Sequence, residues 1–182
     1  MPKPNKFESK LFAVAKRAQK FHTDMTGLWY PLHTHESFFQ NYIAMKVYES
    51  LKFQVYVDAT PTKLEADSNV EVVYGEDNAN KRFDLAFWRK SDINPRVKSI
   101  LEIKHRGSTT KVREDCRKIK EFLEYNEGVS GYALYYTQPA KVTTADSRFS
   151  QISEEPRVSM IKSYINRSEP IWGVALYRCY PS

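Results

Sequence analysis

Cysteine is scarce in this sequence, and long apolar runs are missing from it. Only Cys116 and Cys179 occur among 182 residues. Two distant cysteines suggest neither a disulfide framework nor a zinc cluster, and they fit a reducing compartment. No apolar run approaches the ~18 residues of a membrane span, and the short segment LFAVA is followed at once by Lys16 and Arg17, unlike a signal peptide. We therefore expect an intracellular, cytoplasmic protein with no membrane partner.

Several common catalytic motifs are missing as well. The chain has only 6 glycines, and none of them belongs to a phosphate-binding loop or a glycine-rich dinucleotide turn. No Ser/His/Asp set is visible, and His33 and His35 are two positions apart, which is a poor spacing for metal ligands on a helix. These absences argue against P-loop enzymes, dinucleotide-dependent enzymes and serine hydrolases.

Positive charge and aromatic residues, in contrast, are plentiful. The chain has 28 Lys and Arg against 22 Asp and Glu, a net charge of +6, and 14% aromatic residues. A basic surface favours polyanionic partners such as nucleic acid or membrane surfaces, although many basic proteins bind neither.

Hydrophobic periodicity predicts alternating helices and strands. Apolar residues recur at helical spacing in 7–21, and Thr34 is the expected N-cap of a second helix at 35–51. β-branched and alternating runs predict the strands. After the second helix we expect strands at 53–58, 69–75, 82–88 and 97–105, a helix at 110–125, a strand at 132–137, a polar connection at 138–156, a helix at 157–165 and a strand at 171–180.

This order predicts one α/β domain with a central mixed β-sheet flanked by helices. The domain spans 1–182 and has three parts: an N-terminal helical segment at 1–33, a core at 34–137 and a C-terminal extension at 138–182. In the core a helix is followed by three or four strands, a helix and a strand, which with three strands is the order α-β-β-β-α-β. The extension is a candidate for substrate specificity or for dimer contacts, and the sequence does not separate these two roles.

Acidic residues at positions that should be buried are the first candidates for chemistry. Glu36 falls on the core-facing stripe of the helix at 35–51, although a first-turn acid favoured by the helix dipole explains it too. Asp84 lies inside the apolar strand RFDLAFW, where aspartate is disfavoured. Capping of a turn or pairing with Arg82 is the alternative explanation for Asp84.

Glu102 and Lys104 lie two positions apart in the predicted strand VKSILEIKH, so their side chains share one face. Taken alone, they fit an exposed ion pair worth ~0–1 kcal/mol. If the strands carrying Asp84 and Glu102 are neighbours, both carboxylates can bind one divalent ion. Hard oxygen ligands suit Mg²⁺, and a nearby ammonium can position or help to deprotonate the attacking water. This combination predicts metal-dependent phosphodiester cleavage.

With Asp84 in RFDLAFW and Glu102, Ile103 and Lys104 in LEIKH, the sequence resembles the PD-(D/E)xK nuclease superfamily, which includes restriction endonucleases, resolvases and repair nucleases. The resemblance covers 34–137 and implies a restriction-endonuclease-like core. It implies that Asp84, Glu102 and the backbone carbonyl of Ile103 bind Mg²⁺, for which Mn²⁺ would substitute. It further implies that Lys104 assists the water and that Glu36 is an auxiliary acid and an additional metal ligand.

The sequence departs from the family pattern at two places. Phe83 stands where the motif name has proline, a position that varies in the family. RecB-like members carry a Gln-x-x-x-Tyr motif after the catalytic residues, whereas this sequence has Glu121 in place of the glutamine, followed by Tyr125. This difference argues against a RecB-type exonuclease. A DNA endonuclease is therefore the expected activity, with RNA as an open alternative. Nucleases of this fold often pair to cut both strands, so the resemblance is compatible with a homodimer.

The helix that follows the motif is basic along one face. Arg113, Arg117 and Lys120 form a stripe about 90° from its core-facing residues, with Lys111 nearby, and Arg106 lies in the basic loop KHRGSTTK. These five side chains are candidate nucleic-acid ligands. The alternative is a solvated helix face, because acidic residues lie among the basic ones.

Two other functions fit the same residues. A non-catalytic nucleic-acid-binding or assembly module would keep the fold and bind without metal-dependent turnover. A basic protein-interaction domain would use Glu102 and Lys104 only as an exposed ion pair.

Overall fold

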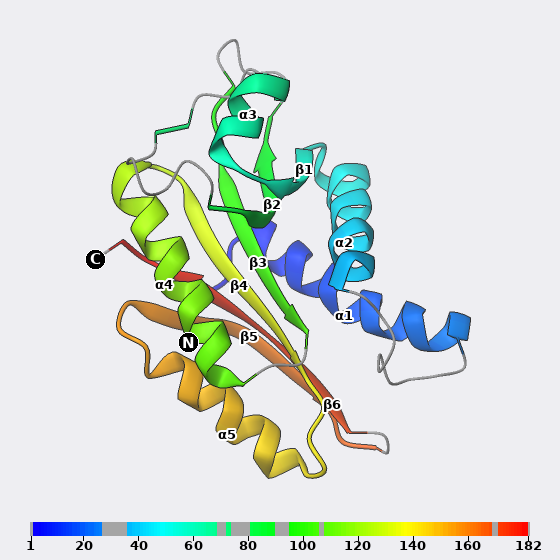
Figure 1. Cartoon of the computed structure of the whole chain (residues 1–182). Helices are drawn as coiled ribbons and strands as arrows, with labels where there is room; N and C mark the ends of the chain where they lie inside the picture. Colours follow the sequence, from blue (N-terminus) through cyan, green and yellow to red (C-terminus); the bar gives the residue numbers. More distant parts are fainter. Residues whose placement is uncertain are drawn as a thin grey trace.

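A six-stranded mixed β-sheet organises the molecule (Figure 1). The computed structural model describes residues 2–26, 36–68, 72–73, 81–89, 95–105, 108–168 and 171–181. The strands are β1 (Gln54–Ala59), β2 (Phe83–Trp88), β3 (Ser99–His105), β4 (Ser130–Thr137), β5 (Val158–Asn166) and β6 (Trp172–Cys179). Their order across the sheet is β1-β2-β3-β4-β6-β5, with β3 and β4 parallel and the other neighbours antiparallel. The predicted α/β class with a mixed sheet is confirmed.

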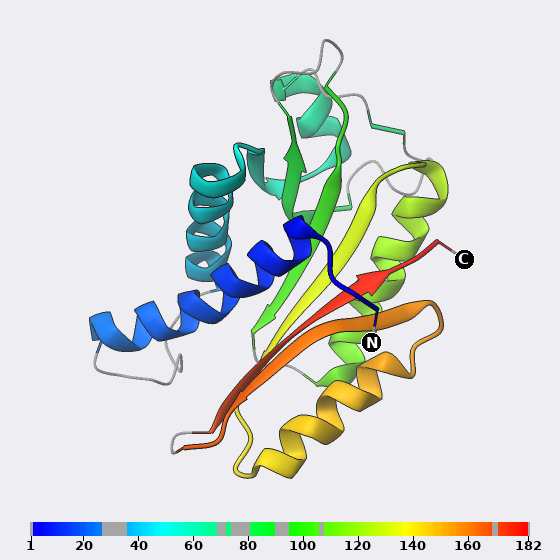
Figure 2. The same ribbon diagram turned by 180° about the vertical axis from the view of Figure 1, so that it is seen from behind.

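Helices cover both faces of this sheet. As Figures 1 and 2 show, α1 (Lys6–Thr26) and α2 (Glu36–Leu51) lie on one face, and α4 (Thr109–Tyr125) and α5 (Val142–Ser153) lie on the other. The short helix α3 (Pro61–Ser68) buries Leu64 in the same apolar cluster as α4 and α5. All six residues of β2 and the first five of β3 are buried, because strands covered on both sides need apolar residues on both faces.

The placement of α4 matters most for function. Ser108 caps its N-terminus by accepting a hydrogen bond from the Lys111 backbone N–H at 3.4 Å. Gly131 on β4 lets the helix approach closely, because a Cβ at this position would lie 2.2 Å from Ile119 Cγ2. The capped, closely packed helix therefore runs beside β3 and β4 and directs two of its polar side chains at the end of β3, as described below.

Most of the predicted core order is confirmed. Helix α2, strands β1, β2 and β3, helix α4 and strand β4 follow one another as expected. Helix α3 was not expected from the sequence. It begins at Pro61, where a missing N–H costs nothing, and Thr60 caps it by accepting a hydrogen bond from the Lys63 backbone N–H at 3.2 Å. Thr34 and most of the predicted strand at 69–75 lie outside the described residues; Val72 and Val73 are described and are not in a strand.

Two predictions in the last third of the chain are wrong. The expected polar connection at 138–156 contains α5, whose buried residues Ala145, Phe149 and Ile152 do have helical spacing. The expected helix at 157–165 is strand β5. Its pairing with β6 shifts register between Met160 and Lys162, so a β-bulge breaks the alternation and produces apolar spacing that imitates a helix. Strand β6 lies beside β4, and β5 and β6 complete the sheet.

Within the described part of the chain, no helix has both the length and the apolar character required to cross a bilayer.

Candidate active site

The candidate site lies where β2 and β3 separate. The ladder between them pairs Leu85 with Leu101 and Ala86 with Ile100, a register that sets Asp84 opposite Glu102. The two strands are thus neighbours, as the metal-site hypothesis required. Asp84 bridges the separating strands, because its Oδ2 accepts a hydrogen bond from the Ile103 backbone N–H at 2.5 Å.

Asp84 is also held from the helix side. Its Oδ1 accepts a hydrogen bond from Gln40 Nε2 on α2 at 2.7 Å, and both side chains are buried. Burial raises the pKa of Asp84 above its ordinary value, although the Ile103 N–H and the nearby lysines oppose the rise. The carboxylate is therefore fixed in position and destabilised in its charged form.

Glu102 is buried more deeply than an exposed ion pair would allow. The residue is 4% exposed, and its Oε1 contacts Lys118 Nζ on α4. Burial, and then repulsion by Asp84, raises the pKa of Glu102 well above its usual range, while Lys118 opposes the rise. The alternative in which Glu102 and Lys104 form an exposed pair is therefore wrong: the partner of Glu102 is Lys118, a residue 16 positions further along.

Lys104 points between two other acids. Its Nζ lies 3.5 Å from Asp115 Oδ2 on α4 and 3.9 Å from Glu36 Oε1 at the start of α2. Burial alone would lower the pKa of Lys104, but Asp115, Glu36, Asp84 and Glu102 raise it, and the net pKa lies above its ordinary value. Lys104 is therefore an ammonium ion at neutral pH.

The structure thus brings all four predicted catalytic side chains to one place: Glu36, Asp84, Glu102 and Lys104. Three further residues belong to the group and were missed in the sequence: Gln40, Asp115 and Lys118. Periodicity offered a signal, because Gln40 lies one helical turn after Glu36, and Asp115 and Lys118 are separated by three positions on α4. Only the tertiary structure shows that both helices meet at the end of β3.

The charge balance of this group favours a bound cation. Four carboxyl groups (Glu36, Asp84, Glu102 and Asp115) face two ammonium groups (Lys104 and Lys118). Burial raises the pKa of Glu36 and of Asp115 too. Glu102 Oε1 and Asp115 Oδ2 are buried, and their lysine contacts lack good hydrogen-bond geometry. Burial is the main cause of these raised pKa values, and repulsion by neighbouring carboxyl groups adds to it for Glu36, Glu102 and Asp115. A bound cation would stabilise the charged forms.

The donor chemistry fits Mg²⁺, which prefers oxygen ligands. Across the described residues, however, no three His, Cys, Asp or Glu side chains lie close enough to hold a metal ion as they stand. Lysines occupy the space between the carboxyl groups instead: Lys118 contacts Glu102, and Lys104 lies between Asp115 and Glu36. Metal binding by Asp84 and Glu102 therefore requires Lys118 to give up its contact with Glu102.

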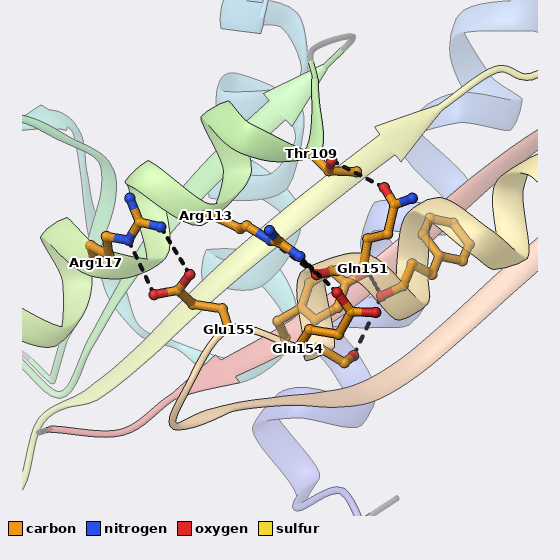
Figure 3. A network of polar contacts seen from close by, with 9 residues as sticks. Thr109, Arg113, Arg117, Gln151, Glu154 and Glu155 are labelled. Carbon is orange, nitrogen blue, oxygen red and sulfur yellow. Dashed lines mark hydrogen bonds and ion pairs between the residues drawn. The ribbon is translucent and has the colours of Figure 1, made fainter.

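Two residues of the predicted nucleic-acid stripe, Arg113 and Arg117, contact the end of α5 and the residues just after it (Figure 3). Arg113 donates to the backbone carbonyl of Gln151 at 3.0 Å and to Glu154 at 3.1 Å. Arg117 makes two contacts to Glu155, at 3.1 and 3.2 Å. These contacts join α4 to α5.

The other three candidate nucleic-acid ligands differ from one another. Lys120 is buried and donates to Glu155 and to the backbone carbonyl of Pro156, both at 3.1 Å. Lys111 is exposed, and Arg106 lies outside the described residues. The pKa of Glu155 is lowered, because Arg117 and Lys120 outweigh the effect of burial. The stripe therefore contains a neutralised ion-pair cluster.

Comparison of the chain with protein-family models, with curated proteins and with solved structures finds no match. We therefore infer the function of the chain from the geometry and electrostatics of the site.

Proposed function

We propose that the protein is a Mg²⁺-dependent nuclease with a restriction-endonuclease-like core, and that DNA is its substrate. The observation that carries the proposal is the placement of Asp84 opposite Glu102 at the point where β2 and β3 separate, with Lys104 two residues beyond Glu102. The motif resemblance to the PD-(D/E)xK superfamily and the order of α2, β1, β2, β3, α4 and β4 support it.

Asp84, Glu102 and the Ile103 backbone carbonyl would hold the metal, and Mn²⁺ would substitute for Mg²⁺. A bound divalent ion supplies Lewis-acid polarisation of the phosphate and a more acidic water. The Ile103 N–H and Gln40 fix both oxygens of Asp84, so this ligand is preorganised. Preorganised charge is what transition-state stabilisation requires.

Because the pKa of Lys104 is raised, we assign Lys104 the role of a charged hydrogen-bond donor rather than that of a base. As an ammonium, Lys104 Nζ donates hydrogen bonds to the attacking water and to the phosphate, and it offsets the charge that develops on the phosphate oxygens. It does not accept the proton of the water. Glu36, whose pKa is raised by burial and by Asp84, is the proton acceptor at its Oε1.

Incubation of supercoiled, linear and single-stranded DNA, and of RNA, with the protein and Mg²⁺, Mn²⁺ or EDTA tests the proposal. Metal-dependent cleavage that is lost in Glu102→Ala supports it. Products cut on both strands at once would fit a homodimer. Absence of cleavage of every substrate with either metal contradicts it.

A second function is favoured by one observation, the ion pair between Lys118 and Glu102. A lysine that permanently neutralises the central acid would suit a non-catalytic nucleic-acid-binding or assembly module. This alternative requires salt-sensitive binding of nucleic acid without turnover, and binding that does not depend on Mg²⁺.

A further inference from the structure

A groove of about 220 Å³ lies between α1 and α2, lined on each helix by side chains at i, i+4 and i+7. Lys10, Val14 and Arg17 come from α1, and Tyr42, Lys46 and Glu49 come from α2. Side chains at this spacing lie on one face of a helix. Two rows of side chains, polar except for Val14, therefore face each other across the groove.

The charge in this groove is only partly neutralised. Lys46 forms an ion pair with Glu49 at 2.8 Å. No carboxylate in the described part of the chain lies within ion-pair distance of Lys10 or Arg17. This distinguishes the groove from the α4 stripe, where Arg113, Arg117 and Lys120 all contact acids or carbonyl groups.

Aromatic rings lie at one side of the groove. The ring of Tyr42 lies 5.2 Å from that of Phe21, which is 41% exposed, and Phe38 stacks on both. Exposed aromatic rings beside unpaired cations are the combination that binds single nucleic-acid strands, because bases stack on the rings while the cations contact the phosphates.

Helix α2 connects the groove to the candidate active site. Gln40 holds Asp84 from one face of the helix, and Lys46 lines the groove from another. The two residues are six positions apart, which is about 9 Å along a helix axis, or roughly three nucleotides at 3.4 Å each. The groove and the candidate active site therefore share helix α2, which presents a different face to each.

We propose that the α1–α2 groove binds one strand of the nucleic-acid substrate, with Lys10 and Arg17 contacting phosphates and Phe21 and Tyr42 contacting bases. The inference rests on the proposed function for the identity of the anion. Charge complementarity selects the partner, and the small volume of the groove selects a single strand over a duplex.

The test is the binding of a fluorescein-labelled single-stranded oligonucleotide, followed by fluorescence anisotropy in EDTA so that cleavage plays no part. The variant is Lys10→Glu/Arg17→Glu. At about 0.1 M salt it should bind at least tenfold more weakly than wild type, and the slope of log K against log[salt] should fall by about 1.4, because each lost single-strand phosphate contact removes about 0.7.

The matched control is Lys63→Glu/Lys141→Glu, which changes the net charge equally at exposed positions on α3 and at the start of α5. Its affinity should remain close to that of wild type. Lys10→Arg/Arg17→Lys should restore binding, and circular dichroism should show that all variants are folded. If the charge reversal unfolds the protein, Lys10→Gln/Arg17→Gln replaces it, with the same direction of effect expected.

Unchanged affinity in the folded groove variant overturns the proposal, and so does an equal loss in the matched control. Loss of binding to phosphatidylserine vesicles with oligonucleotide binding retained would assign the groove to a lipid surface and also overturn it. The nuclease proposal can fail separately. If the wild-type protein binds through Lys10 and Arg17 but never cleaves, the groove proposal stands and the nuclease proposal is wrong. A wild-type protein that binds no nucleic acid contradicts both.

Discussion

Lys118 on α4 contacts Glu102 on β3, and Glu102 is 4% exposed. The pair joins a helix to the edge at which β2 and β3 separate. Burial raises the pKa of Glu102 well above its ordinary value, although Lys118 opposes the rise. A carboxylate in such surroundings is retained at a cost to stability. We interpret that cost as a requirement of the proposed metal site.

Removal of Lys118 should destabilise the protein more than neutralisation of Glu102. Lys118→Met leaves a buried carboxylate without its cation and should lower the free energy of unfolding by about 3 kcal/mol. Glu102→Gln removes the buried charge and should leave stability unchanged or higher. Urea unfolding measures both effects, with Lys111→Met, at an exposed position on the same helix, as the control.

The double variant Lys118→Met/Glu102→Gln completes this experiment. It should recover most of the stability lost in Lys118→Met, because no buried charge remains. A Lys118→Met variant as stable as wild type would contradict the ion-pair account.

Stability should depend on pH through the same carboxyl groups. The folded pKa values of Glu36, Asp84, Glu102 and Asp115 lie above those of the unfolded chain, so the folded state binds more protons. Their contribution is complete below about pH 4, near the unfolded pKa values. It is lost as the pH rises through the raised folded values, because stability falls with pH where the folded state holds more protons.

Unfolding in urea across a pH series, compared between wild type and Glu102→Gln, isolates this effect. The wild type should lose more stability than the variant between pH 4 and neutrality, and Glu127→Gln, which changes an exposed acid, should follow the wild type. Identical pH profiles for wild type and Glu102→Gln would show that Glu102 titrates normally.

Magnesium should reverse part of that loss. An ion that binds only the folded state stabilises it by about 2.7 kcal/mol at a hundred times its dissociation constant. Thermal unfolding with and without Mg²⁺ should show a rise in Tm for wild type and none for Asp84→Asn. The rise should grow with pH, since the ligands bind metal as carboxylates. An equal rise in Asp84→Asn would place the metal elsewhere.

The α4 stripe should matter for stability rather than for substrate binding. Glu155→Gln deprives Arg117 and buried Lys120 of their carboxylate and should lower the free energy of unfolding by about 2 kcal/mol. Arg117→Gln should leave oligonucleotide affinity close to that of wild type in the anisotropy assay. If Arg117→Gln lost as much affinity as the groove variant, this prediction would be wrong and the stripe would be a nucleic-acid-binding surface.

The sequence predicted the core and the four central residues because both follow from local periodicity. Strand alternation placed Glu102 and Lys104 on one face, and the helical stripe of α2 turned Glu36 inward. The apolar strands around Asp84 and Glu102 indicated that these acids needed a special reason to be buried. Each of these predictions uses only residues that lie a few positions apart in the sequence.

The missed features depend on contacts between distant segments. Glu155 lies 38 positions from Arg117, so nothing local shows that the stripe on α4 contacts α5. Lys118 acquires its role only because α4 packs against β3, and the β-bulge after Met160 makes β5 resemble a helix in the sequence. Tertiary packing therefore decided which charged residues belong to the site.

The rate at which supercoiled plasmid is nicked in Mg²⁺ tests the nuclease proposal most directly, with wild type, Asp84→Asn, Glu102→Gln and Lys104→Ala compared as folded proteins of equal purity. We predict metal-dependent nicking by wild type, and rates at least a hundredfold lower in each variant, in the range that loss of a transition-state contact produces. Nicking that persists unchanged in Glu102→Gln, or that is absent from wild type with both Mg²⁺ and Mn²⁺, would contradict it.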